Sequence, residues 1–143
     1  MATVIDLYSR AVISWSIQPT MTRELACDAF TMALWRRRFP RGVLCHSDRG
    51  GQYCYDDYQK MLEVHGLVCS MSRKGNCWDN AVAESFFHTI KTEMIYSERY
   101  ITREKAKQST FQYIEVYYNR IRRHSSIGSI APDVFENQAK IVA

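Results

Sequence analysis

The sequence lacks the features that would carry a protein into or across a membrane. No apolar run approaches the roughly 20 residues that a helix needs to span a bilayer. The first ten residues contain Asp6 and no long apolar stretch, so they do not resemble a secretory signal peptide. We therefore expect a cytoplasmic protein.

The cysteine pattern argues against two structural devices. The chain has five cysteines, an odd number, and no two of them form a Cys-x-x-Cys pair. This argues against both a disulfide framework and a structural zinc site. Cys45 and Cys69 stand in short apolar runs, so we expect both to be small buried side chains.

The remaining composition is that of an ordinary folded domain. A length of 143 residues suits one domain, with 46% hydrophobic and 24% charged residues. The net charge of +4 permits a polyanionic partner without requiring one. Basic residues gather at Arg36–Arg38 with Arg41, and again at Arg120–His124. Each cluster is as typical of a solvated helix end as of a binding surface.

Strand-like and helix-like segments alternate along the chain, which predicts an α/β layer with mixed strands. β-branched and aromatic residues indicate strands, and apolar residues at helical spacing indicate helices. Proline, glycine and capping residues mark the boundaries; Pro40 and Gly42, for example, are expected to end the first helix. The expected segments are an extended region over 1–17 with a connection at 7–11, a helix from Thr22 to Arg38, a strand over 43–45, a helix over 55–65 closed by Gly66, a strand over 67–69, a helix from about 79 to 95, a helix over 103–122, and a surface tail after His124 that contains Gly128 and Pro132.

One acid stands where α/β sheets commonly place their sites. Asp48 follows the short strand over 43–45 and precedes two glycines. Sites in such sheets gather beyond the carboxyl ends of strands, so this carboxylate can point into a cleft from a fixed backbone. An Asp in that place is also a common turn former, and the position alone does not decide between the two roles.

A second acid shares a helix face with two basic residues. At 100° per residue, His88 and Lys91 lie within about 40° of Glu84 on a helical wheel, and the apolar stripe that includes Phe86 and Ile90 faces away. Glu84 could hold a divalent metal while His88 and Lys91 meet phosphate. A Glu early in a helix is also a common partner of the helix dipole.

Several longer motifs, in order along the chain, carry a family resemblance. His46–Tyr53 reads HSDRGGQY, Asp79–Phe87 reads DNAVAESFF, and 35 residues separate Asp48 from Glu84. Val4–Arg10 reads VIDLYSR, and Tyr118–Ser125 contains YNR followed by RHS. With Ser70-Met71-Ser72 between them, these motifs resemble those of bacterial insertion-sequence transposases made from two overlapping reading frames. The resemblance spans nearly the whole chain.

The resemblance implies a fold and a chemistry. It implies a ribonuclease H-like mixed sheet flanked by helices, with residues 1–102 as a catalytic core lacking its first strand and 103–143 as a C-terminal helix and tail. It also implies DNA cleavage and strand transfer at two Mg²⁺ or Mn²⁺ ions. Asp48 and Glu84 match two of the three catalytic metal ligands. The third belongs to the missing strand, and Asp6 does not match it.

The resemblance also implies partners. DNA at the element ends and the target would be contacted by the basic residues near the acids and at the C-terminal motif. The chain is expected to self-associate or to pair with full-length transposase. Alone, it is expected to bind metal weakly. Three alternatives remain open: a non-catalytic DNA-binding or assembly module, a ribonuclease H-type nuclease, and a scaffold. The candidate DNA contacts are His88, Lys91, Arg73, Lys74, Arg120, Arg122, Arg123 and His124.

Overall fold

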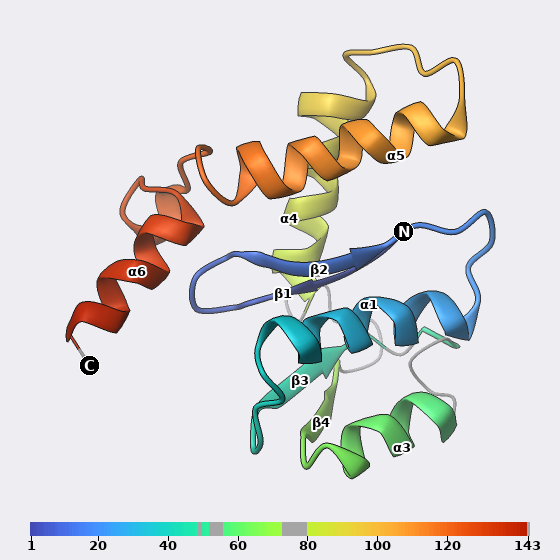
Figure 1. Ribbon diagram of the computed structural model, residues 1–143, viewed down its shortest axis with the longest axis vertical. Coiled ribbons are helices and arrows are strands. Elements are labelled where there is room, and N and C mark those ends of the chain that lie inside the picture. The colour runs from blue at the N-terminus through green and yellow to red at the C-terminus, as the bar shows by residue number, and fades with distance from the viewer. Residues whose placement is uncertain (49, 52–55, 73–79, 143) are drawn as a thin grey trace. The chain divides into compact units, whose positions relative to one another are not determined.

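The computed structural model is a mixed α/β chain and describes residues 1–48, 50–51, 56–72 and 80–142. Strands and helices alternate as expected (Figure 1). Within the described ranges, no helix is long and apolar enough to cross a membrane. The elements are β1 (Ala2–Ile5), β2 (Val12–Ser16), α1 (Arg23–Arg36), β3 (Leu44–Ser47), α3 (Asp56–Val64), β4 (Val68–Met71), α4 (Ala81–Ile90), the π-helical η2 (Lys91–Ile95), α5 (Arg103–Gln112), the π-helical η3 (Tyr113–Tyr118), the 3-10 turn η4 (Ser125–Ile127) and α6 (Pro132–Val142).

The chain packs as two compact units, and the β1–β2 hairpin contributes to both. Unit 1 comprises Met1–Val4 and Ile13–Ala81, and unit 2 comprises Ile5–Val12 and Val82–Ala143. The two units are defined by which residues pack together. The boundary expected at residue 102 is a different division, between a catalytic core and a C-terminal helix and tail. That boundary stays a prediction.

The strands of the described residues form two separate pairs, β1–β2 and β3–β4, rather than one continuous mixed sheet. β3 and β4 are parallel, with Leu44 opposite Val68. Within unit 1 the two strand pairs are connected through side-chain packing. Val4 of β1 and Cys45 of β3 both pack against the buried side chains of α1 and α3.

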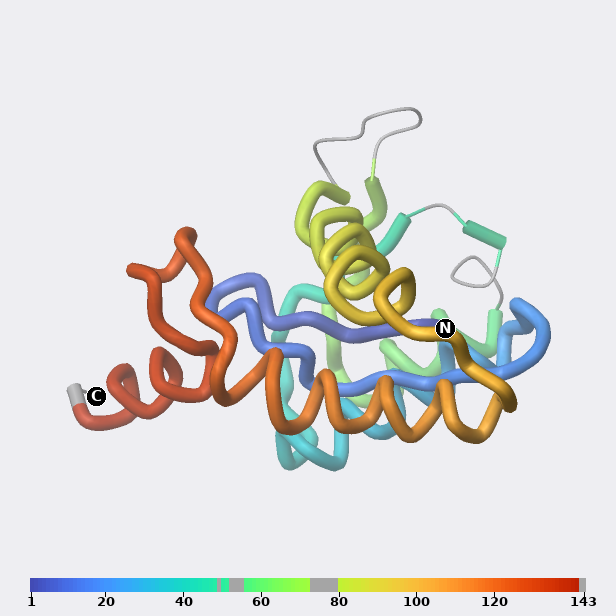
Figure 2. The backbone as a smooth tube through the Cα atoms, turned by 90° about the horizontal axis from the view of Figure 1, so that it is seen from above, coloured from blue at the N-terminus to red at the C-terminus, as the bar shows by residue number. Residues whose placement is uncertain are grey.

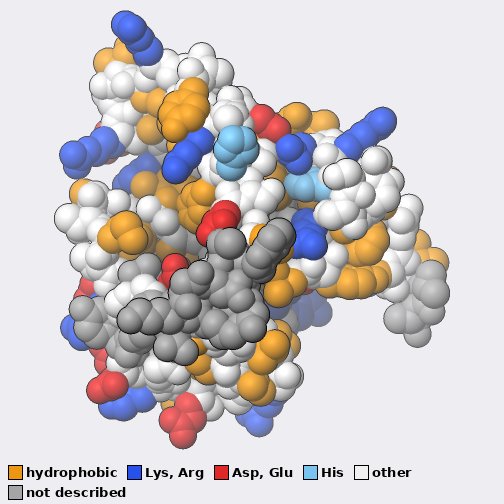
Figure 3. Space-filling view, turned by 180° about the vertical axis from the view of Figure 1, so that it is seen from behind, with side chains coloured by type: hydrophobic (Ala, Val, Ile, Leu, Met, Phe, Trp, Pro, Cys, Tyr) orange, Lys and Arg blue, Asp and Glu red, His pale blue; other side chains and the backbone are white. Residues whose placement is uncertain are grey.

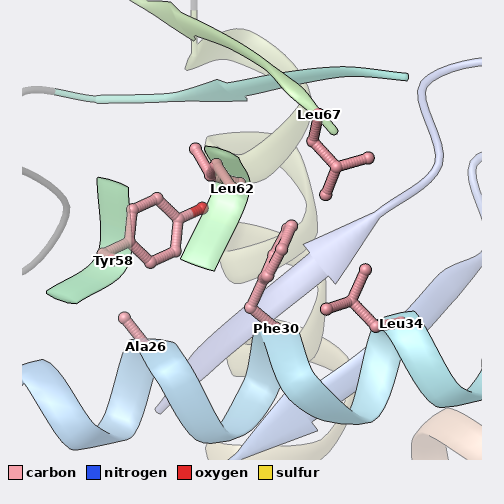
Figure 4. Close-up of a cluster of buried hydrophobic side chains, with 6 residues drawn as sticks. All are labelled: Ala26, Phe30, Leu34, Tyr58, Leu62 and Leu67. Atoms are coloured by element: carbon pink, nitrogen blue, oxygen red, sulfur yellow. The ribbon is translucent and has the colours of Figure 1, made fainter. Parts of the chain in front are cut away.

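The core of unit 1 lies between α1, α3 and the residue before β4 (Figure 4). The ring of Phe30 meets the edge of Tyr58 at a centroid distance of 5.5 Å. The prediction that Cys69 is buried is wrong, because the apolar run before it buries only Leu67 in this core, while Cys45 is half-buried. The buried residues are Ala26, Phe30, Leu34, Tyr58, Leu62 and Leu67.

The turn after α3 closes on a glycine, as expected. Gly66 has φ 66°, and its amide donates to the carbonyl of Glu63. The amide of Leu67 donates to the carbonyl of Leu62. This pair of bonds is the Schellman motif, in which the left-handed residue is usually glycine.

The turn after α1 uses the same bonds with an arginine at the left-handed position. Arg38 has φ 57°, its amide donates to the carbonyl of Trp35, and the amide of Phe39 donates to the carbonyl of Leu34. The helix therefore ends before Pro40 and Gly42, the residues that were expected to stop it. Backbone bonding, rather than a glycine, terminates it.

We expect Arg38→Gly to stabilise the chain by about 1 kcal/mol, because a left-handed residue with a Cβ costs roughly 1–2 kcal/mol and glycine avoids that cost. Gly66→Ala is the mirror experiment and should destabilise by about 1 kcal/mol. Its added Cβ would meet only Arg41 at ordinary contact distance, so backbone strain would dominate. Urea unfolding measures both changes, and equal stability of the two variants would contradict the argument.

Unit 2 is built on two long helical segments. α4 continues into η2, and α5 continues into η3 as one rod, visible in orange in Figure 2. Phe86 of α4 meets the edge of Tyr118 of η3 at 5.1 Å. Ile90 of α4 and Ile114 of η3 are also buried. The two helices thus present their apolar faces to the interior of unit 2.

The expectation of a surface tail after His124 is wrong. Ile127, Ala131 and Pro132 are buried, and α6 begins at Pro132. Proline suits the first position of a helix, since its missing N–H would have no partner there. That signal, followed by a run with helical spacing, was available in the sequence.

Two of the sequence motifs meet in unit 2. The side-chain amide of Asn119 both accepts from the backbone amide of Val12, at 2.9 Å, and donates to its carbonyl, at 3.0 Å. The hydroxyl of Ser9 donates to Glu136 of α6 at 2.6 Å. Asn119 of the C-terminal YN element thus binds the start of β2, just after the VIDLYSR motif.

Candidate functional site

Asp48 lies where the sequence placed it, directly after a parallel strand. β3 ends at Ser47, and the Oδ1 of Asp48 accepts a hydrogen bond from the amide of Gly50 at 2.8 Å. This bond orients the carboxylate at the carboxyl end of β3. Asp48 is exposed to solvent.

His46, two residues before this acid, is a further polar residue near the end of β3 that was not predicted as a site residue. Its Nδ1 shares a hydrogen bond with the hydroxyl of Ser70, the residue opposite it on β4, at 3.0 Å. His46 thus lies on β3 two residues before Asp48, which follows the end of the strand.

Glu84, His88 and Lys91 are exposed on α4 and at the start of η2, while Phe86 and Ile90 are buried. The predicted two-faced helix is therefore confirmed. Lys91 begins the π-helical turn, a wider turn that often occurs at functional sites. The sequence pattern gave no sign of this change in helical pitch.

The two candidate acids belong to different compact units, Asp48 to unit 1 and Glu84 to unit 2. Among the described residues, no group of three or more His, Cys, Asp or Glu side chains could hold a metal ion. The Oδ1 of Asp6 accepts hydrogen bonds from the amides of Tyr8 and Ser9 in the hairpin turn.

The expected DNA contacts divide into two kinds. Arg120 and Arg123 are exposed, and Arg120 makes only a loose ion pair with Asp133 at 3.8 Å. Basic side chains stand out on the face drawn in Figure 3. Arg73 and Lys74 lie outside the described residues. A phosphate could therefore reach Arg120 and Arg123 directly.

Arg122 and His124 are engaged inside unit 2. Arg122 forms a two-pronged ion pair with Glu93, in which its Nη2 lies 2.7 Å from Oε1 and its Nε lies 2.9 Å from Oε2. His124 is only 8% exposed, and its ring meets the edge of Tyr118 at 4.7 Å. Both side chains support the helix pair rather than stand out from it.

Glu93 is the centre of this network, although no motif in the sequence marks it. The phenol of Tyr113 donates to its Oε2 at 2.7 Å. The hydrogen bond from Arg122 lowers the pKa of Glu93, and burial together with the Glu93 carboxylate raises the pKa of Tyr113. Burial lowers the pKa of His124, and the charge of Arg122 adds to the effect. Glu93 is therefore held as a carboxylate.

We expect Glu93→Gln to destabilise the chain by about 1–2 kcal/mol, because Arg122 would keep a half-buried charge without its partner. Since the folded-state pKa of Glu93 is depressed, its contribution is present above the unfolded pKa of about 4.3 and is lost as the pH falls through the folded value. Thermal unfolding at neutral and acid pH measures this. Arg123→Gln is the control and should change stability by less than about 0.5 kcal/mol. The prediction would be contradicted by an equal loss of stability in both variants. It would also be contradicted if the stability difference between the parent and Glu93→Gln did not shrink at acid pH.

Comparison with known proteins identifies the family. The integrase core domain pattern matches residues 1–77, and a second integrase core domain pattern matches residues 65–132. The chain therefore belongs to the integrase core domain family. By family it is an enzyme, as the motifs indicated.

Its relatives include insertion-sequence proteins. The chain is 58% identical over 138 residues to transposase InsF for insertion sequence IS3A of Escherichia coli (strain K12), covering 96% of this chain and 48% of that protein. It is 44% identical over 138 residues to the insertion element IS600 uncharacterized 31 kDa protein of Shigella sonnei, covering 96% and 51%. The predicted transposase resemblance is confirmed. The chain spans about half the length of the curated relatives it matches.

Proposed function

We propose that this chain carries part of the catalytic core of a DNA transposase, which cleaves and joins DNA by metal-dependent phosphoryl transfer. The observation that carries the proposal is the pair of exposed acids on rigid elements, Asp48 at the tip of a parallel strand and Glu84 on the solvent face of α4. The motif order and the transposase relatives support it. Cytoplasmic action on DNA and self-association belong to the same proposal.

The proposed fold is ribonuclease H-like. The order of two strands, helix, strand, helix, strand and helix supports it, as does the shared packing of Val4 and Cys45 on one core. In this proposal the two strand pairs belong to one mixed sheet. α3 then makes the crossover between the parallel strands β3 and β4.

The residues present suit a hard divalent cation. Carboxylate oxygens are the ligands that Mg²⁺ and Mn²⁺ prefer, and the bond from Gly50 orients the exposed carboxylate of Asp48. Asp48 and Glu84 would hold the metal, which supplies activation of a water or 3′-hydroxyl and stabilisation of the leaving oxygen. His46, which shares a hydrogen bond with Ser70 on the neighbouring strand, would help to hold the end of β3 from which Asp48 follows.

The exposed basic residues would position the DNA. His88 and Lys91 follow Glu84 along one helix face, and Arg120 and Arg123 are exposed in the C-terminal motif. Contacts of this kind go to phosphates, so they orient the duplex without reading its sequence. Arg73 and Lys74 stay proposed contacts on the motif alone. We assign Arg122 and His124 a supporting role, through Glu93 and Tyr118.

The test compares this chain with a version extended upstream of Met1 to include the family's first strand and its acid. Each protein is incubated with DNA carrying element ends, with Mg²⁺ and with EDTA, and cleavage is followed on labelled strands. We expect Mg²⁺-dependent cleavage by the extended version and much weaker cleavage by the chain. Binding without cleavage by both would favour the assembly module, and equal cleavage by both would overturn the proposed weakness of the chain.

A further inference from the structure

A second concentration of basic residues lies at the end of α1, away from the acid at the tip of β3. Between Asp28 and Asp48 the sequence holds four arginines and no acidic residue. Arg38 and Arg41 are exposed, and neither pairs with a carboxylate among the residues that the structure describes. The exposed side chains of Arg38 and Arg41 therefore give the end of α1 a local positive charge.

Aromatic rings stand in the middle of this surface. Trp35 is 69% exposed and Phe39 is 39% exposed. Phe39 lies between two rings, 4.8 Å from Trp35 in an edge-on contact and 5.5 Å from His65. The Schellman turn fixes the backbone of Arg38 and Phe39. The indole is thus held in place while most of it faces water.

The parallel strands place this surface at their amino ends. The turn of Gly42 is joined to that of Gly66 by a backbone hydrogen bond of 2.8 Å just before β3 and β4 begin, whereas Asp48 follows the carboxyl end of β3 (Figure 1). The two ends of the strand pair therefore carry different chemistry. We name Trp35, Arg38, Phe39, Arg41 and His65 the basic aromatic patch.

We propose that the basic aromatic patch binds a single strand of nucleic acid. Arginines meet the phosphates, and an exposed indole stacks on an unpaired base, a combination that recognises single strands with little sequence preference. A duplex keeps its bases stacked inside and would reach only the arginines. A protein partner would use the rings as well, but the exposed Arg38 and Arg41 beside them match a polyanion. This inference goes beyond the metal site, and it rests on the proposed function only in the choice of DNA as the ligand.

The experiment measures binding of a fluorescent oligo-dT strand by anisotropy over a range of salt concentrations. Trp35→Ala should weaken binding about tenfold, since one stacked base contributes on that order. The double variant Arg38→Gln/Arg41→Gln should reduce the slope of log K against log salt by about 1.4, at roughly 0.7 for each lost phosphate contact. Lys60→Gln, an exposed residue of α3, should change neither. Circular dichroism checks that each variant is folded, which is expected because Trp35 is on the surface.

Tryptophan fluorescence gives an independent reading. Quenching by the strand should persist in Lys60→Gln and largely disappear in Trp35→Phe. Failure of the parent chain to bind, or equal affinity of the parent and Trp35→Ala, would overturn the proposal. Loss of self-association in Trp35→Ala without a change in strand binding would reassign the patch to a protein interface. Strand binding is measured in EDTA, where the proposed metal site holds no ion, so failure of the patch and failure of the metal site are told apart.

Discussion

Glu84→Gln, made in a transposase long enough to be active, is expected to lower Mg²⁺-dependent DNA cleavage by at least about 100-fold. A catalytic metal contributes several kcal/mol of charge stabilisation, and each 1.4 kcal/mol is about tenfold in rate. Glutamine keeps the size of the side chain on the exposed face of α4, so the loss would come from the missing charge. Single-turnover cleavage of a labelled element end measures it.

Glu104→Gln is the matched control. Glu104 is exposed in the first turn of α5, as Glu84 is in the first turn of α4, so any effect of removing a helix-dipole partner would be common to both. Asp48→Asn should match Glu84→Gln in cleavage, and Glu104→Gln should cleave like the parent. Full activity of Glu84→Gln, or equal losses for the two glutamates, would reduce Glu84 to a helix-stabilising residue.

The sequence predicted the faces of elements better than their ends. The orientation of Glu84 followed from the spacing of Phe86 and Ile90, because a 3.6-residue period fixes which side of a helix meets the core. The place of Asp48 followed from an apolar run that ends at a turn. Both are local properties, and the structure confirms the helix face and the strand tip.

The features that the sequence did not give depend on partners distant in the chain. The sequence suggests that Arg122 contacts phosphate. In the structure it is bonded to Glu93, 29 positions away. Arg38 reads as one of several surface cations, yet the backbone bonds at the end of α1 place it in a left-handed conformation that composition does not reveal. The π-helical turns that begin at Lys91 and Tyr113 are likewise not apparent from the 3.6-residue spacing of the sequence.

Phe86→Ala is expected to cost about 3–5 kcal/mol of stability, the range for removing a buried aromatic ring. Phe86 is only 1% exposed, and its ring rests edge-on against Tyr118. It also sits two positions from Glu84, on the opposite side of α4. The large cavity would therefore loosen the support of the candidate acid as well as the core of unit 2.

Denaturant unfolding measures the cost, with Ile101→Ala as the control. Ile101 is 95% exposed, so its loss should change stability by less than about 0.5 kcal/mol. Where Phe86→Ala does not fold, Phe86→Leu keeps much of the volume and should cost less than half as much, which keeps the comparison measurable. A cost for Phe86→Ala no larger than that for Ile101→Ala would mean that α4 does not pack through Phe86. In that case the orientation of Glu84 would lose its physical basis, because the buried ring is what turns the acid toward solvent.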